Sequence, residues 1–237
     1  MLFAALETSG DWCSVALWLD GEITCVEQRA ASRHSELALP MLEALFRKTK
    51  TSVGALDAIA FGAGPGSFTG LRIACGLAQG LALARGLPVI GISAFEAIAQ
   101  EAAPGSGVAR VVACIDARMR EVYYAALERQ GEPHSPSWRE VIAGQCVAPH
   151  EAPPPPGEGW IGCGSGFAAF PDFMTKSISV KRPEVHPTAL AIAHLAAPRL
   201  AAGEGVDAAA ATPLYLRDKV AFTTDELASR PARSIPR

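Results

Sequence analysis

The 237-residue chain is poor in charge, and its charge is nearly balanced. Charged residues make up 19% of it, and 21 Lys and Arg against 24 Asp and Glu leave a formal net charge of −3. A protein that grips nucleic acid by itself needs a basic face, because phosphates must be neutralised. The charge balance therefore argues against an independent RNA binder, and a partner would have to hold any RNA.

Long apolar runs are also missing. None approaches the ~20 residues that cross a membrane, and no basic region precedes an apolar segment at the N-terminus. The six cysteines are scattered through apolar stretches without a C-x-x-C pair, which is typical of buried, reduced thiols. With 49% hydrophobic residues to form a core, the sequence predicts a cytoplasmic globular protein with no membrane contact.

The sequence contains no recognisable catalytic or metal-binding motif. The five histidines form neither H-x-x-x-H nor H-E-x-x-H, and no serine lies in a G-x-S-x-G elbow. Glu7 and Asp116 end equivalent strands, and two such acids could hold hydrated magnesium near a phosphate. Asp116 is followed by Arg118 and Arg120 rather than by glycines. We therefore assign no catalytic and no metal residue, and keep a small ATP-dependent kinase as an alternative function.

The two halves of the chain repeat one order of elements. The elements expected in the first half are strands at 2–7, 12–19, 22–29, 58–61 and 88–92 and helices at 34–48, 70–85 and 93–102. After a Pro- and Gly-rich break at 104–107, an acid-ended strand, a turn and a β-rich strand restart the order. This duplication predicts an α/β fold of two ribonuclease H-like lobes, 1–103 and 104–220, with mixed sheets flanked by helices and a weakly ordered tail at 221–237.

The stretch from 58 to 86 indicates a strand, a glycine turn and a helix. Thr69 is expected to cap the helix, because its hydroxyl can accept a hydrogen bond from a first-turn amide. A glycine turn that opens a helix is an anion site by geometry, but no Lys follows Gly70 and the spacing misses the dinucleotide fingerprint. We interpret the segment as a structural or vestigial phosphate loop, formed by Gly64, Pro65, Gly66, Ser67, Phe68, Thr69 and Gly70. A second turn, at 162–166, is either a remnant adenosine-binding turn or a plain strand-to-helix turn.

Two helices carry more apolar surface than one sheet face needs. Apolar residues cover roughly 220° of the helix at 34–48, whereas a surface helix needs about 100°. The helix at 70–85 is apolar nearly all round, and Gly76 and Gly80 in its interior each cost around 1 kcal/mol against Ala. Close packing by another backbone is the expected compensation, either in this chain's own core or, as we favour, at a protein interface. The predicted interface residues are Leu39, Leu42, Phe46, Arg72, Gly76, Gly80 and Leu83.

Five stretches, in this order and at these spacings, resemble the bacterial TsaB family. They are LETSGDWCSVAL, ASRHSELALPML, FGAGPGSFTGLRIACGLAQGLA, IDARMREVYYA and PLYLRDKVA. The resemblance runs from about Leu2 to Ala221, and PGSFTGLR is its most specific block. It implies an actin-like ATPase fold and a non-catalytic scaffold subunit of the machinery that makes threonylcarbamoyladenosine in tRNA.

The resemblance also implies partners. A catalytic paralogue, TsaD, transfers the threonylcarbamoyl group to N6 of the adenosine next to the anticodon, and a P-loop ATPase, TsaE, acts beside it. The scaffold subunit pairs with TsaD, or with itself when isolated, through helices of its first lobe, and it reaches tRNA only through the complex. No cofactor is expected in the isolated subunit, and a nucleotide at the partner interface is left open.

One departure separates scaffold from catalyst. The paralogue shares the PGSFTGLR block but carries a metal-binding histidine pair in a helix after the loop, whereas residues 86–103 here contain no histidine. The resemblance thus argues against threonylcarbamoyl transfer and against a metallopeptidase-like hydrolase. The wide apolar helix faces are then the expected functional surface.

Overall fold

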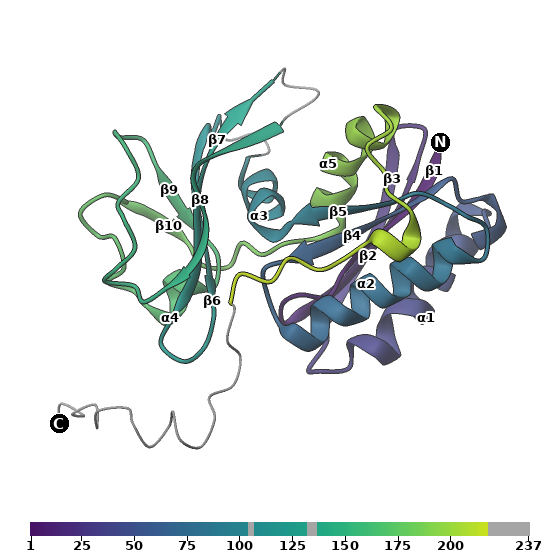
Figure 1. The fold of residues 1–237 in the computed structure, drawn as a ribbon, viewed down its shortest axis with the longest axis horizontal. Coiled ribbons are helices and arrows are strands. Elements are labelled where there is room, and N and C mark those ends of the chain that lie inside the picture. Colours follow the sequence, from purple (N-terminus) through teal and green to yellow (C-terminus); the bar gives the residue numbers. More distant parts are fainter. Residues whose placement is uncertain (104–106, 132–136, 218–237) are drawn as a thin grey trace.

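The fold, seen in a computed structural model, consists of two lobes, each built on a mixed five-stranded sheet (Figure 1). The structure describes residues 1–103, 107–131 and 137–217. The first sheet has the order β3-β2-β1-β4-β5 and the second the order β10-β9-β6-β7-β8. The strands of the first sheet are β1 (Leu2–Glu7), β2 (Trp12–Leu19), β3 (Glu22–Arg29), β4 (Ala58–Gly64) and β5 (Val89–Ser93). Those of the second sheet are β6 (Arg110–Asp116), β7 (Val122–Gln130), β8 (Ser137–Val147), β9 (Ile161–Cys163) and β10 (Val180–Arg182).

The two sheets have the same topology. In the first, β1, β2 and β3 form an antiparallel meander, and β4 and β5 follow in parallel on the other side of β1. In the second, β6, β7 and β8 form the meander, and β9 and β10 follow in parallel beside β6. The predicted duplication into two lobes with mixed sheets is confirmed. β8 was not predicted, because its sequence does not alternate cleanly between apolar and polar residues.

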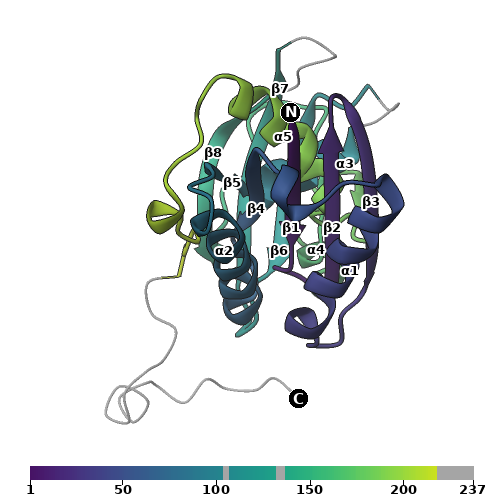
Figure 2. The same cartoon turned by 90° about the vertical axis from the view of Figure 1, so that its right-hand side faces the viewer.

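Helices cover both faces of the first sheet. The helices of the chain are α1 (His34–Thr49), α2 (Phe68–Leu83), α3 (Ala94–Ala102), α4 (Gly166–Ala169) and α5 (Ala189–Ala201), with 3₁₀ turns η1 (Val53–Ala55) and η2 (Ala208–Ala210), and of these α4 packs on β6 and β9 of the second sheet instead. Figure 2 shows α1 and α2 side by side on the outer face of the first sheet, where they contact its strands and each other. α5 follows the second sheet in sequence but packs against β1, β2 and β4 of the first. No helix in the described part of the chain is both long and apolar enough to span a bilayer.

One hydrophobic core joins the two lobes. Phe3 of β1, Phe95 of α3, Val111 of β6 and Ile192 of α5 belong to the same buried cluster, and each is at most 1% exposed. Figure 1 shows α3 and α5 between the two sheets. Apolar burial is thus continuous from the first sheet to the second, so the lobes are held by packing rather than by a bare linker.

The start of α2 differs from the prediction. The helix begins at Phe68, and the side chain of Ser67 accepts a 3.4 Å hydrogen bond from the Gly70 amide. The expectation that Thr69 caps this helix is therefore wrong, because Thr69 already lies inside the first turn. β4 also continues to Gly64, three residues past the predicted strand end. The predicted tail at 221–237 and most of the break at 104–107 lie outside the described residues.

Candidate functional site

The glycine loop is closed against the turn between β1 and β2. A Cβ atom on Gly70 would lie 1.9 Å from the Thr8 carbonyl oxygen, and one on Gly66 would lie 2.6 Å from the Ser9 carbonyl oxygen. The Ser67 amide donates to that Ser9 oxygen at 2.7 Å, and the Thr8 hydroxyl donates to the Gly70 carbonyl at 2.7 Å. The glycines therefore allow two segments of this chain to approach closely, and the chain's own backbone occupies the space opposite the loop.

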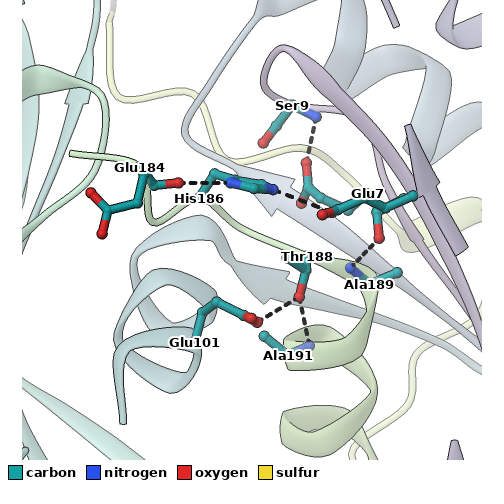
Figure 3. Close-up of polar contacts among 10 residues, drawn as sticks. Glu7, Ser9, Glu101, Glu184, His186, Thr188, Ala189 and Ala191 are labelled. Atoms are coloured by element: carbon teal, nitrogen blue, oxygen red, sulfur yellow. Dashed lines mark hydrogen bonds and ion pairs between the residues drawn. The ribbon is translucent and has the colours of Figure 1, made fainter. Parts of the chain in front are cut away.

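Glu7 ends β1 directly beneath this loop and is 1% exposed. One carboxyl oxygen, Oε1, accepts a hydrogen bond from the Ser9 amide, and Oε2 has no hydrogen-bond partner among the described residues (Figure 3). A Cβ atom on Gly62 would lie 1.8 Å from Oε2, so the carboxyl group is packed on β4. Burial raises the pKa of Glu7 to about 7, and the contacts with Ser9 and the charge of His186 lower it only in part. Such an enclosed acid is poorly placed to hold hydrated magnesium.

Asp116 ends β6 at the equivalent place in the second lobe, and its carboxylate is already engaged. Oδ1 accepts the Arg118 amide at 2.8 Å, and Oδ2 lies 3.1 Å from Arg118 Nη1. Arg118, Met119 and Arg120 all have positive φ angles, so the turn reverses direction through three left-handed residues without a glycine. The two acids that motivated the kinase alternative are thus buried in one case and paired in the other.

The second glycine turn also packs on this chain. A Cβ atom on Gly164 would lie 2.2 Å from the Cys114 carbonyl oxygen, and one on Gly166 would lie 2.2 Å from Cys114 Sγ. Gly162 faces the ring of Phe167, whose nearest atom would be 2.5 Å from a Cβ. This geometry favours the plain strand-to-helix turn, because β6 and α4 fill the space that an adenine ring would need.

The described histidines belong to no cluster of potential metal ligands. The Glu184 carbonyl oxygen accepts a hydrogen bond from His186 Nδ1 at 2.9 Å, His186 Nε2 lies 3.2 Å from a Glu27 carboxylate oxygen, and the imidazole stacks on Trp12 with ring centroids 5.2 Å apart. His34 is buried at the first position of α1. Within residues 1–103, 107–131 and 137–217, no group of three or more His, Cys, Asp or Glu side chains could hold a metal ion.

On α1, the predicted partner face divides into core and surface. Leu42 is 2% exposed and packs beneath the helix with Leu45, so its assignment to a partner surface is wrong for the folded chain. Phe46 is partly buried against the same core cluster, whereas Leu39 is 40% exposed. The apolar arc of roughly 220° predicted for this helix includes both core and surface residues, and only the position of the sheet distinguishes the two groups.

On α2, the residues with an open environment form what we call the α2 face: Arg72, Gly76, Gly80 and Leu83. Leu83 is 70% exposed, and nothing lies within 4 Å of a Cβ atom built on Gly76 or Gly80. The opposite side of the helix buries Ala74, Ala78 and Ala82 in the core. Packing inside this chain therefore does not compensate the two glycines.

A C-terminal segment, residues 211–217, crosses from α2 to the second lobe, and we call it the strap. Gln79 Nε2 donates to the Ala211 carbonyl at 3.0 Å, and the Leu214 amide donates to the Ala63 carbonyl of β4 at 2.7 Å. At its far end, Arg217 pairs with Glu121 at 2.6 Å. The sequence marked this segment only as part of the family resemblance, since no local pattern shows which helix it touches.

Comparisons with known proteins agree with this fold and these motifs. A sequence profile described as "TsaD: tRNA N6-adenosine threonylcarbamoyltransferase" matches residues 25–223. The chain is 38% identical over 226 residues to an Escherichia coli K12 protein named tRNA threonylcarbamoyladenosine biosynthesis protein TsaB, covering 94% of this chain and 97% of the relative. It is 37% identical over 225 residues to the protein of the same name from Haemophilus influenzae, with 92% and 94% covered.

Solved structures give the same result. A solved structure described as YeaZ from Pseudomonas aeruginosa aligns with a TM-score of 0.84 at 36% identity, covering 91% of this chain and 99% of that one. A second Pseudomonas aeruginosa structure, described as an uncharacterized protein with similarity to peptidase YeaZ, aligns with a TM-score of 0.85 over the same shares. The shared architecture confirms the expected actin-like fold. Identity over nearly the full length of both chains shows that this chain belongs to the TsaB family.

Proposed function

We propose that this chain is a scaffold and activating subunit for threonylcarbamoyl transfer to N6 of the adenosine next to the anticodon in tRNA. Its relatives in Escherichia coli and Haemophilus influenzae carry the name of threonylcarbamoyladenosine biosynthesis proteins. The chain acts in the cytoplasm by binding a TsaD-like transferase, works beside a TsaE-like P-loop ATPase, and contacts tRNA only within that complex. In isolation it forms a homodimer through the same helices.

The observation that carries this proposal is the α2 face. Two interior glycines each cost around 1 kcal/mol of helix stability, and nothing in this chain approaches them to offset that cost. A partner helix can approach the α2 backbone closely at these two glycines, because small residues let two helices pack closely. Leu83 adds exposed apolar surface one turn after Gly80, and Leu39 of the neighbouring helix α1 is exposed as well. The transferase covers this surface in the proposed complex.

A non-catalytic role fits the state of the two turns. Backbone atoms of Thr8 and Ser9 fill the space opposite the glycine loop, and Glu7 is enclosed under it. Arg118 already holds the carboxylate of Asp116. We therefore place no cofactor in the isolated subunit, and any nucleotide would be held jointly with the partner.

The test is a charge on the α2 face. Gly80→Glu leaves the folded chain undisturbed, since nothing lies within 4 Å of the new Cβ, and it should abolish co-purification with the transferase. Ala168→Glu places the same charge on an exposed position of α4 and should leave binding intact. Unchanged affinity of Gly80→Glu would show that another surface binds the partner. Calorimetry that finds micromolar ATP binding with turnover by the isolated chain would instead support the kinase alternative.

A further inference from the structure

Arg72 is the one charged residue in the sequence of α2. It lies one helical turn before Gly76, so both residues lie on the same side of the helix. Any surface that covers the glycines therefore also covers Arg72. A guanidinium taken out of water without a counter-charge strongly weakens an interface, whereas a well-paired one contributes to specificity.

The side chain of Arg72 is already fixed in the folded chain. Its guanidinium carbon lies 3.7 Å from the centre of the Phe68 ring, and Nε donates to the Tyr215 hydroxyl at 3.2 Å. The Phe68 and Tyr215 rings lie 5.7 Å apart and are 42% and 45% exposed. We call these three residues the Arg72 cluster. One face and one edge of the guanidinium are thus occupied from within the chain.

The strap holds Tyr215 in place from both lobes. Leu214, its neighbour, donates a backbone hydrogen bond to β4, and Arg217 pairs with Glu121 of the second lobe. Because the chain itself orders the aromatic rings and the arginine, binding costs less conformational entropy at this point. Clusters of this composition, an arginine beside exposed aromatic rings, are common among the residues that dominate interface energies.

The terminal nitrogens of Arg72, Nη1 and Nη2, make no ion pair with any described residue. Two parallel N–H groups match the two oxygens of a carboxylate. Resting on the proposed function, we propose that the Arg72 cluster is the specificity site of the interface and binds an Asp or Glu side chain of the transferase. A polyphosphate ligand such as RNA is disfavoured, because Arg217, two residues after Tyr215 in the strap, is already paired with the Glu121 carboxylate.

The test measures dissociation constants between the full chain and purified transferase at several salt concentrations. Arg72→Gln should weaken binding at least about tenfold and reduce its salt dependence, because one interfacial ion pair is lost. Arg72→Lys keeps the charge but loses the planar fork, so it should restore only part of the affinity. Lys176→Gln removes the same charge from an exposed loop and serves as the matched control. Arg72 is exposed, so these variants should stay folded, which a cooperative thermal unfolding transition verifies.

A charge swap identifies the partner residue. Arg72→Glu should lose binding, and one acid-to-lysine change on the transferase should restore it. Failure of every such change to restore binding would overturn the carboxylate assignment. If Gly80→Glu abolishes binding while Arg72→Gln binds normally, the inference is wrong and the proposed function stands. If neither changes binding, the proposed function fails. If Arg72→Gln weakens only tRNA binding by the complex, an RNA phosphate is the ligand and the inference is overturned.

Discussion

Replacing Glu7 by Gln should change the pH dependence of stability more than a substitution of any other carboxyl residue within 1–103, 107–131 and 137–217. Glu7 is 1% exposed, and burial raises its pKa from 4.5 to about 7 in the folded chain. Between these values the folded state holds a proton that the unfolded state has released. The free energy of unfolding therefore falls as pH rises through this window, and the shift corresponds to about 3 kcal/mol at 1.36 kcal/mol per unit.

Gln cannot ionise, so the free energy of unfolding of Glu7→Gln does not fall in this way as pH rises. Its amide oxygen can still accept from the Ser9 amide, while the amide nitrogen takes the place of the unpartnered Oε2 beside Gly62. A constant offset at every pH does not affect the comparison, and the stability of the variant relative to the parent chain should rise by about 2.5 kcal/mol from about pH 5 to about pH 8. Burial lowers the pKa of His34 and His194, which has the opposite sign, and this contribution cancels in the comparison.

The assay is urea unfolding of both proteins across that range, with the difference in free energy plotted against pH. The charge of His186 lowers the pKa of Glu7, and Glu7 in turn helps to raise the pKa of Cys13. Glu204→Gln, at an exposed position after α5, corrects for the loss of one negative charge. A difference that stays flat with pH would refute the reasoning, because it would mean that Glu7 is not buried as an ionisable group.

The remaining predictions concern the two helices on the outer face. Leu42→Ala should lower the free energy of unfolding by about 2–5 kcal/mol because Leu42 is core, whereas Leu39→Ala on the exposed side should change it by less than about 0.5 kcal/mol; equal losses in urea unfolding would contradict the division of α1. Gly76→Ala should stabilise the monomer by about 1 kcal/mol, since its Cβ meets nothing within the chain, while Gly70→Ala should destabilise it because its Cβ would meet the Thr8 carbonyl. A stabilising Gly70→Ala would show that the loop is not closed on the β1–β2 turn.

Local sequence pattern was sufficient for much of the fold. β1, β2 and β3 begin and end where apolar runs and the Asp20-Gly21 turn predict, and α1 begins at His34 as expected. These features depend on residues within a few positions of each other. The repeat of acid, turn and β-rich strand likewise sufficed for two lobes, and the shared topology of the two sheets confirms it. β8 was not predicted because its sequence lacks a comparable alternation of apolar and polar residues.

The functional meaning of the same residues depended on contacts between distant segments. Gly66 and Gly70 could equally serve a phosphate or a close backbone approach, and the backbone of Thr8 and Ser9 decides between them. Leu39 and Leu42 look alike in sequence, yet one faces solvent and the other the core.

Arg72 and Tyr215 meet across 143 positions in the chain. By itself the sequence determined most elements of the first lobe, the duplication and the apolar excess of two helices, because hydrophobic periodicity is a local property. Only the tertiary structure decided beside which glycines the space for a side chain is occupied and beside which it is free, because that depends on which distant backbone packs against each glycine.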